Sequence, residues 1–278
     1  MKEFLARYWK SNRTKAGTIL LLMVFVFAFI GPFFTDIDPF EMAGFMYERP
    51  SSQYLLGTDN FGRDVFVGLI YGTRTSMIVG FMAGVIATII GTTIGCYAGY
   101  FGGKMDGFLS SVTNLFLVIP PFVILILLSI SLESRGIFLL AVIIGITSWP
   151  WVARSVRSQV SSLRVREHVN IARISGFSTF KIIIREILPY LLSYIFMAFI
   201  LQVSIGIINE ATLSMLGLGA FNTISLGEMM NWALNYEAIR SGVWWAFVPP
   251  VIMIALITFS LKFINTGMDE IFNPKLRN

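Results

Sequence analysis

Six stretches of the chain contain no charged side chain, and they cover residues 16–35, 75–103, 107–132, 136–153, 187–209 and 241–261. The shortest has 18 residues and the longest 29, and about 20 apolar helical residues cross a bilayer core of roughly 30 Å. The stretches lack the alternation of apolar and polar positions that is typical of barrel strands. Because the backbone inside lipid must satisfy its own hydrogen bonds, the pattern predicts six transmembrane helices.

The same pattern divides the chain into segments. Residues 1–15 form an N-terminal segment, 16–35 the first transmembrane helix and 36–74 a long polar loop. Residues 75–265 form a core with five further transmembrane helices, and 266–278 a polar tail. The predicted fold class is therefore an all-α polytopic membrane protein.

The distribution of Lys and Arg orients the predicted helices. With the N-terminus inside, 16 of the 21 Lys and Arg residues lie in the inner segments 1–15, 104–106, 154–186 and 262–278. Of the 16 acidic residues, 10 lie on the other side. An excess of Lys and Arg in short loops marks the cytoplasmic side, so both termini are predicted to be cytoplasmic. Since topology accounts for the net charge of +5, nucleic acid is not expected as a partner.

The chain has little catalytic or metal-binding chemistry. Cys96 is the single cysteine and His168 the single histidine, so neither an intrachain disulfide nor a Cys or His metal site is expected. No Gly-x-Ser-x-Gly elbow occurs, which argues against a serine hydrolase. The stretch closest to a phosphate-binding loop, 102–105, lacks the first glycine and the Ser or Thr after the lysine. We therefore predict no catalytic, cofactor-binding or metal-binding residue and a chain that is not an enzyme.

Coupling to an ion gradient is also disfavoured by the pattern. Secondary transporters place ionisable side chains within their spans, and the six stretches contain none. Glu210 lies just past the outer end of the fifth stretch and is the nearest candidate for a proton relay. We interpret it instead as a structural or solvated carboxylate, which is the commoner role at such a position. A chain of this kind needs an external source of energy.

Glycine and proline indicate how the helices pack and bend. The second span carries two glycine groups with four-residue steps, Gly80 and Gly84 followed by Gly91, Gly95 and Gly99. Such spacing allows another helix backbone to approach closely, within the chain or in a partner. Pro120 and Pro121 in the third span and Pro249 and Pro250 in the sixth are predicted to kink or break those helices.

The polar loop at 154–186 has 33 residues and seven cations. Apolar side chains recur in it at the spacing of an amphipathic helix, namely Val156, Val160, Leu163, Val169, Ala172 and Ile174. Gly176 suits a helix end, Ser178 a helix N-cap, and Pro189 the first turn of the next span. The loop is predicted to form a helix, a glycine turn and a second helix. A solvated basic loop and a helix lying on the membrane surface remain alternatives.

Residues 167–176 (EHVNIARISG), with Ile187-Leu188-Pro189 downstream, resemble the EAA loop of binding-protein-dependent ABC importer permeases, which are type I ABC importers. The form of the motif is similar to the dipeptide/oligopeptide/nickel branch, although Asn170 and Ile171 replace the first Glu-Ala of the general motif. The resemblance implies a coupling helix that docks into a groove of an ATPase subunit. The residues it assigns to coupling are Glu167, Ala172, Arg173, Ile174, Gly176, Leu188 and Pro189. Among them, Ala172 and Ile174 would pack in the groove, and Glu167 and Arg173 would make polar contacts.

Further motifs extend this resemblance over nearly the whole chain and are similar to the C-type permease subunit of the branch. They include 56–59 (LGTD), 62–65 (GRDV), 70–72 (IYG), 216–219 (LGLG) and 273–277 (NPKLR). The resemblance implies a homologous second permease subunit, two ABC ATPase subunits that bind ATP and Mg²⁺, and an extracytoplasmic solute-binding protein. That protein would dock on the outer loop, with Asp59, Arg63 and Asp64 as candidate contacts. The implied location is a bacterial or archaeal cell (inner) membrane.

Several functions remain open from the sequence. The expected one is a permease subunit of an ATP-driven importer for di- or oligopeptides, forming half of the translocation pathway. Nickel, glutathione and oligosaccharides are alternative solutes, because the binding protein usually selects the solute in this family. A gradient-driven transporter and a membrane scaffold or sensor are the alternative classes. Dependence of uptake on ATPase partners separates the first function from these two.

Overall fold

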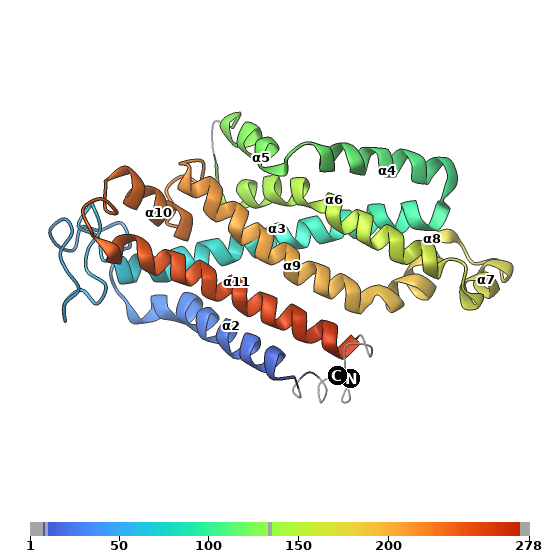
Figure 1. The fold of residues 1–278 in the computed structure, drawn as a ribbon, viewed down its shortest axis with the longest axis horizontal. Coiled ribbons are helices and arrows are strands. Elements are labelled where there is room, and N and C mark those ends of the chain that lie inside the picture. Colours follow the sequence, from blue (N-terminus) through green and yellow to red (C-terminus); the bar gives the residue numbers. More distant parts are fainter. Residues whose placement is uncertain (1–7, 9–10, 133–134, 273–278) are drawn as a thin grey trace.

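The computed structural model describes residues 8, 11–132 and 135–272, and every regular element in this part of the chain is a helix. The terminal motif at 273–277 lies outside the described residues. Five long helices run side by side along the longest axis of the molecule (Figure 1), namely α2 (Asn12–Ile30), α3 (Val65–Phe101), α6 (Ile137–Leu163), α9 (Leu188–Met215) and α11 (Trp244–Phe272). Within the described residues, each of these five helices with its continuations is long and apolar enough to cross a membrane.

The third predicted span is a bent pair of helices, α4 (Gly103–Val118) and α5 (Pro121–Ile130), whose axes differ by 79°. Ile119 has extended backbone angles (φ −77°, ψ 127°), as expected for a residue that precedes proline. The break predicted at Pro120 and Pro121 is therefore confirmed. Counted as one span, the pair brings the described part of the chain to the six predicted spans.

Of the predicted kink or break at Pro249 and Pro250, the break is absent, because α11 continues through both residues. They lie in the second turn of the helix, where the two missing N–H groups would have bonded to the carbonyls of Trp245 and Ala246. The rest of α11 keeps its own hydrogen-bonding pattern, so the helix remains one element.

Short elements cap the two ends of the bundle. The 3₁₀ turn η1 (Gly31–Phe34) extends α2, and α10 (Leu226–Asn235) follows α9. The EAA-like loop contains α7 (Glu167–Ile174), α8 (Thr179–Ile182) and the π-helical turn η2 (Ile183–Ile187). Figure 1 places α7, the start of α2 and the end of α11 towards one end of the molecule, with α10 and the loop 35–64 at the other. The start of α2 and the end of α11 thus lie on the same side of the bundle.

The glycines of α3 allow close contact with two different helices. A methyl group at Gly80 would lie 2.2 Å from Cγ1 of Ile207 on α9. At Gly91 it would lie 2.6 Å from Cβ of Val152 on α6, and Gly95 and Gly99 face the same helix. The close packing predicted from the glycine spacing is therefore confirmed. Gly80 contacts α9, whereas Gly91, Gly95 and Gly99 contact α6.

All five long helices extend beyond their charge-free stretches at one end. Helix α3 begins at Val65, so Arg74 lies within it and the outer loop ends earlier than residue 74. Helix α9 continues to Met215 and includes Glu210, which is only 1% exposed. The prediction that Glu210 lies beyond the span is wrong, because buried serine hydroxyls give its carboxylate a polar environment inside the bundle.

Candidate coupling and docking sites

The predicted loop 154–186 begins as the last part of α6, which continues to Leu163. The rest of it forms two short helices joined at Gly176, as predicted. Gly176 has φ +76°, which is a backbone region that glycine adopts without a steric penalty. Its N–H donates to the carbonyl of Arg173 over 3.1 Å, and the N–H of Phe177 donates to that of Ala172 over 3.1 Å. These two bonds form a Schellman motif, which satisfies the last carbonyls of α7 and turns the chain towards α8.

One face of α7 packs on the chain itself. Val169 and Ala172 are buried in an apolar cluster with Val156, Val160 and Ile187. Ala172 was expected to pack in the groove of an ATPase subunit. Its methyl group instead holds α7 on the bundle and presents little surface to a partner. Of the six apolar positions of the predicted amphipathic spacing, Val156, Val160, Leu163, Val169 and Ala172 are buried, whereas Ile174 is exposed.

The opposite face of α7 is free. Glu167 is the first residue of the helix and is exposed, and Ile171 and Ile174 have exposed fractions of 58% and 87%. Arg173 is also exposed, with its guanidinium 5.7 Å from the ring centre of Tyr100 and Nη1 3.4 Å from Oδ1 of Asn170. The exposed face thus offers two large apolar side chains next to one acidic and one basic residue.

The second half of the loop connects α7 firmly to α9. Ser178 caps α8 by accepting the N–H of Lys181 over 3.4 Å. Pro189, the exposed second residue of α9, has no N–H for the carbonyl of Arg185, and the π turn η2 precedes it. Leu188 is half-buried, and its N–H bonds to the carbonyl of Ile183. His168 Nε2 lies 3.2 Å from the carbonyl of Glu186, so α7 and η2 are joined.

Asp59 and Asp64 in the outer loop hold local backbone. Oδ1 of Asp59 accepts the N–H groups of Phe61 (2.7 Å) and Arg63 (2.9 Å). Burial raises the pKa of Asp59, and these two hydrogen bonds and the charge of Arg63 oppose that shift. Asp64 is the N-cap of α3, because its Oδ1 accepts the N–H groups of Phe66 (2.7 Å) and Val67 (3.3 Å). An acidic residue before a long apolar run is a helix-start signal that could have indicated this role.

Arg63 connects the outer loop to α10. Its guanidinium lies 4.4 Å from the ring centre of Phe61, 4.8 Å from that of Trp232 and 5.2 Å from that of Phe40. Cation–π contacts of this kind stabilise by about 0.5–2 kcal/mol each, depending on burial. All three candidate docking residues therefore maintain the shape of the loop, and its exposed surface comes from other side chains, such as Met42 and Phe45.

Sequence reasoning missed a polar cluster inside the bundle. Glu210 accepts hydrogen bonds from Ser76 on α3 (2.6 Å) and from Ser214 one turn further along α9 (2.7 Å). The serines are neutral, so the cluster is built from hydroxyls rather than from an opposite charge. The signal was present in the sequence as a lone carboxylate beside an apolar run. In the described residues, no group of three His, Cys, Asp or Glu side chains comes together as a metal site.

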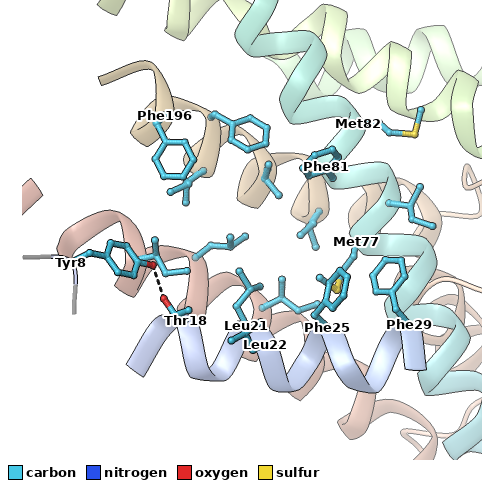
Figure 2. A pocket seen from close by; sticks show the side chains of 18 residues that line it. Tyr8, Thr18, Leu21, Leu22, Phe25, Phe29, Met77, Phe81, Met82 and Phe196 are labelled. Carbon is cyan, nitrogen blue, oxygen red and sulfur yellow. Dashed lines mark hydrogen bonds between the residues drawn. The ribbon is translucent and has the colours of Figure 1, made fainter. Parts of the chain in front are cut away.

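A cavity of about 590 Å³ lies between α2, α3, α9 and α11. Figure 2 shows its aromatic and aliphatic walls, with Phe25 and Phe29 from α2, Phe81 from α3 and Phe196 from α9. Tyr8 and Thr18 form a hydrogen bond of 2.6 Å between their hydroxyls at one end. Burying the charged ends of a peptide in such walls would require desolvation without compensating bonds. The cavity is therefore unsuited to a peptide and suited to apolar groups.

Comparison with known proteins agrees with this architecture. The chain is 34% identical over 275 residues to the dipeptide transport system permease protein DppC of Bacillus subtilis, covering 98% of this chain and 84% of that protein. It is 35% identical over 278 residues to the oligopeptide transport system permease protein OppC of Salmonella typhimurium, covering 98% and 90%.

Solved structures show the same fold. A chain of the inward-facing MetNI methionine ABC transporter aligns with a TM-score of 0.53 at 22% identity, covering 72% of this chain and 95% of the other. Residues 91–278 also match the family described as the binding-protein-dependent transport system inner membrane component. This match includes α6, α7 and α9, which build the loop with the Schellman turn. The chain therefore belongs to the family of inner membrane components of binding-protein-dependent transport systems.

Proposed function

We propose that this chain is the permease subunit of an ATP-driven importer for di- or oligopeptides and forms half of the translocation pathway. The observation that carries the proposal is the similarity over 98% of the chain to a dipeptide permease, together with the free face of α7. Oligopeptide permeases of similar coverage support the peptide class as well. Nickel, glutathione and oligosaccharides remain the alternative solutes.

Coupling to ATP hydrolysis is assigned to the loop 154–186. Its helix α7 projects from the bundle, and its exposed Ile171 and Ile174 can enter a groove on an ATPase subunit. Glu167 and Arg173 lie beside them as polar contacts, and Gly176, Leu188 and Pro189 determine how α7 is connected to α9. ATP-driven closure of two ATPase subunits would then move α7 and α9 together, since packed helices move as rigid bodies.

Because the sequence shows no phosphate-binding loop, we assign the ATP-hydrolysing function to partner subunits. We assign a homologous second permease, two ATPase subunits that bind ATP and Mg²⁺, and an extracytoplasmic solute-binding protein. The Lys and Arg bias supports a cytoplasmic position for both termini and for α7. The loop 35–64 and α10, at the opposite end in Figure 1, then form the surface for the binding protein.

Reconstitution tests the proposal. The chain would be placed in liposomes alone, with its second permease, and with the permease pair and both ATPase subunits. A labelled dipeptide would be supplied with the binding protein, with and without ATP. We expect uptake only in the complete, ATP-supplied complex. Uptake by the single chain, or uptake driven by an ion gradient without ATPase subunits, would contradict the proposal.

A further inference from the structure

A polar groove lies where α3 ends beside the loop that carries α7. Its volume is about 470 Å³, and we call it the headgroup groove, lined by Tyr100, Phe101, Arg164, Val165, Asn170 and Arg173. Three separate parts of the chain meet there: the last turn of α3, the residues just after α6, and α7. The groove thus joins the end of a membrane-spanning helix to the helix assigned to coupling.

The groove is positively charged. Its lining contains two arginines and no acidic residue. Nη1 of Arg164 lies 3.4 Å from the carbonyl oxygen of Tyr100 and 3.5 Å from that of Gly99, while Arg173 lies over the ring of Tyr100. In the described part of the chain, neither arginine forms an ion pair, and Asp106 nearby is held by Arg157. Both guanidinium groups therefore keep donors for an anion.

The position of the groove fits the membrane surface. Its inner wall is the end of α3, a helix that qualifies as a membrane span. Tyr97 stacks on Phe101 with ring centres 6.0 Å apart, and Tyr100 contacts Phe101 at 5.7 Å. Aromatic side chains of this kind gather at the level of lipid headgroups. The two arginines consequently lie beside the aromatic end of a helix that qualifies as a membrane span.

We propose that the headgroup groove binds the phosphate group of an anionic phospholipid from the cytoplasmic leaflet. Arginine matches phosphate oxygens with paired N–H donors, and basic pockets beside spans on the cytoplasmic side bind anionic headgroups. The assignment of the leaflet rests on the topology under the proposed function. Bound there, the lipid bridges the end of α3 and α7 and holds the coupling helix at the membrane surface.

The geometry of α7 separates this site from the ATPase surface. Helical residues are about 100° apart, so Glu167, Ile171 and Ile174 share the face opposite the buried Val169. Arg173 lies about a third of a turn from Glu167, at the flank next to Tyr100. Under this proposal Arg173 contacts the lipid phosphate rather than the ATPase subunit, which can still reach Ile174 on the other side of α7.

Native mass spectrometry of the delipidated full chain in detergent tests the site. The chain is titrated with phosphatidylglycerol and, in parallel, with phosphatidylcholine. We expect preferential binding of phosphatidylglycerol, weakened about fivefold by Arg164→Gln and by Arg173→Gln, since each basic residue near an anionic surface contributes about 1 kcal/mol. The matched control is Arg185→Gln, an exposed cation of the same loop outside the groove, which should bind as the unmodified chain does.

Further measurements identify the ligand and separate the lipid-site proposal from the proposed transport function. Unfolding temperatures show whether each variant is still folded. Arg173 is exposed, so Arg173→Gln tests the site even if Arg164→Gln folds poorly. Equal lipid binding by all variants would overturn the site. Displacement of the lipid by millimolar inorganic phosphate, or by added ATPase subunits, would overturn the lipid assignment. The binding assay needs neither transport nor partners, so failed uptake with intact lipid binding would contradict only the proposed function.

Discussion

Glu210 on α9 accepts a hydrogen bond from Ser76 on α3 over 2.6 Å, although 134 positions separate the two residues in the chain. The Oγ of Ser76 also accepts the N–H of Leu226, the first residue of α10, over 3.2 Å. Ser214 donates to the other carboxylate oxygen of Glu210 over 2.7 Å. A single buried side chain therefore connects α3, α9 and, through Ser76, α10 at one end of the bundle.

We expect Glu210→Ala to lower the free energy of unfolding by about 2–4 kcal/mol, since each buried hydroxyl left without an acceptor costs roughly 1–3 kcal/mol. Glu210→Gln keeps the shape and one acceptor oxygen, so its effect should be smaller. Thermal unfolding of the full chain in detergent, followed by tryptophan fluorescence, measures both. Glu237→Ala, at a largely exposed carboxylate of the same end, is the control with little expected change. Equal stability of Glu210→Ala and Glu237→Ala would show that the cluster does not hold these helices.

Gly176→Val should disturb coupling without disturbing membrane insertion. No atom lies within 4 Å of the position of the added side chain, so the φ of +76° is the source of the penalty, at about 1–2 kcal/mol. The turn after α7 would change while the spans remain untouched. In the complete complex, we expect normal assembly of the permease in the membrane and reduced peptide-stimulated ATP hydrolysis and uptake.

The control for this change is Gly107→Val in α4, which also has open space around it but no positive φ. It should leave ATPase stimulation close to that of the unmodified complex. Normal uptake together with normal ATPase stimulation in Gly176→Val would remove the loop 154–186 from the coupling role.

Gly91→Ala tests the contact of α3 with α6. The added methyl group would lie 2.6 Å from Cβ of Val152 and 2.8 Å from the carbonyl oxygen of Trp149. Both neighbours belong to a helix that would have to move, and overpacking of this kind costs about 1–3 kcal/mol. We expect a lower unfolding temperature than for Gly107→Ala, where a helical glycine with open surroundings is replaced. An unchanged unfolding temperature would mean that α6 can shift freely.

The free energy of unfolding of Asp59→Asn, compared with that of the unmodified chain, should increase as the pH rises. Burial raises the pKa of Asp59 above its ordinary 3.8, so the folded state holds the proton more tightly than the unfolded state. The stabilising effect of the bound proton is present below pH 3.8 and is lost as the pH rises through the folded pKa. Asparagine keeps the oxygen that accepts the two backbone N–H groups and does not ionise.

Unfolding temperatures of both proteins at pH 4 and pH 7 measure this effect. Asp38→Asn is the control, because Asp38 also accepts a backbone N–H, from Phe40, but is exposed. The same pH dependence in Asp38→Asn would attribute the change to the general acidity of the loop rather than to the buried carboxylate.

The features that depend on local chemistry could be predicted from the amino-acid sequence alone. Charge-free stretches specify spans because lipid admits no unpaired charge over that length. Pro120 breaks the third span and Gly176 ends α7, because each acts on the backbone of its immediate neighbours. The motifs around Gly176 and Pro189 likewise indicated the family before any contact was known.

Tertiary packing determines which side chains meet. It buried Ala172 between α7 and the bundle, gave Asp64 and Arg63 structural contacts, and placed Glu210 among serines. It also divided the glycines of α3 between α6 and α9. These outcomes depend on how each helix is rotated and shifted against partners far away in the chain. Helix rotation results from packing all the spans at once, so no local pattern of apolar and polar residues specifies it.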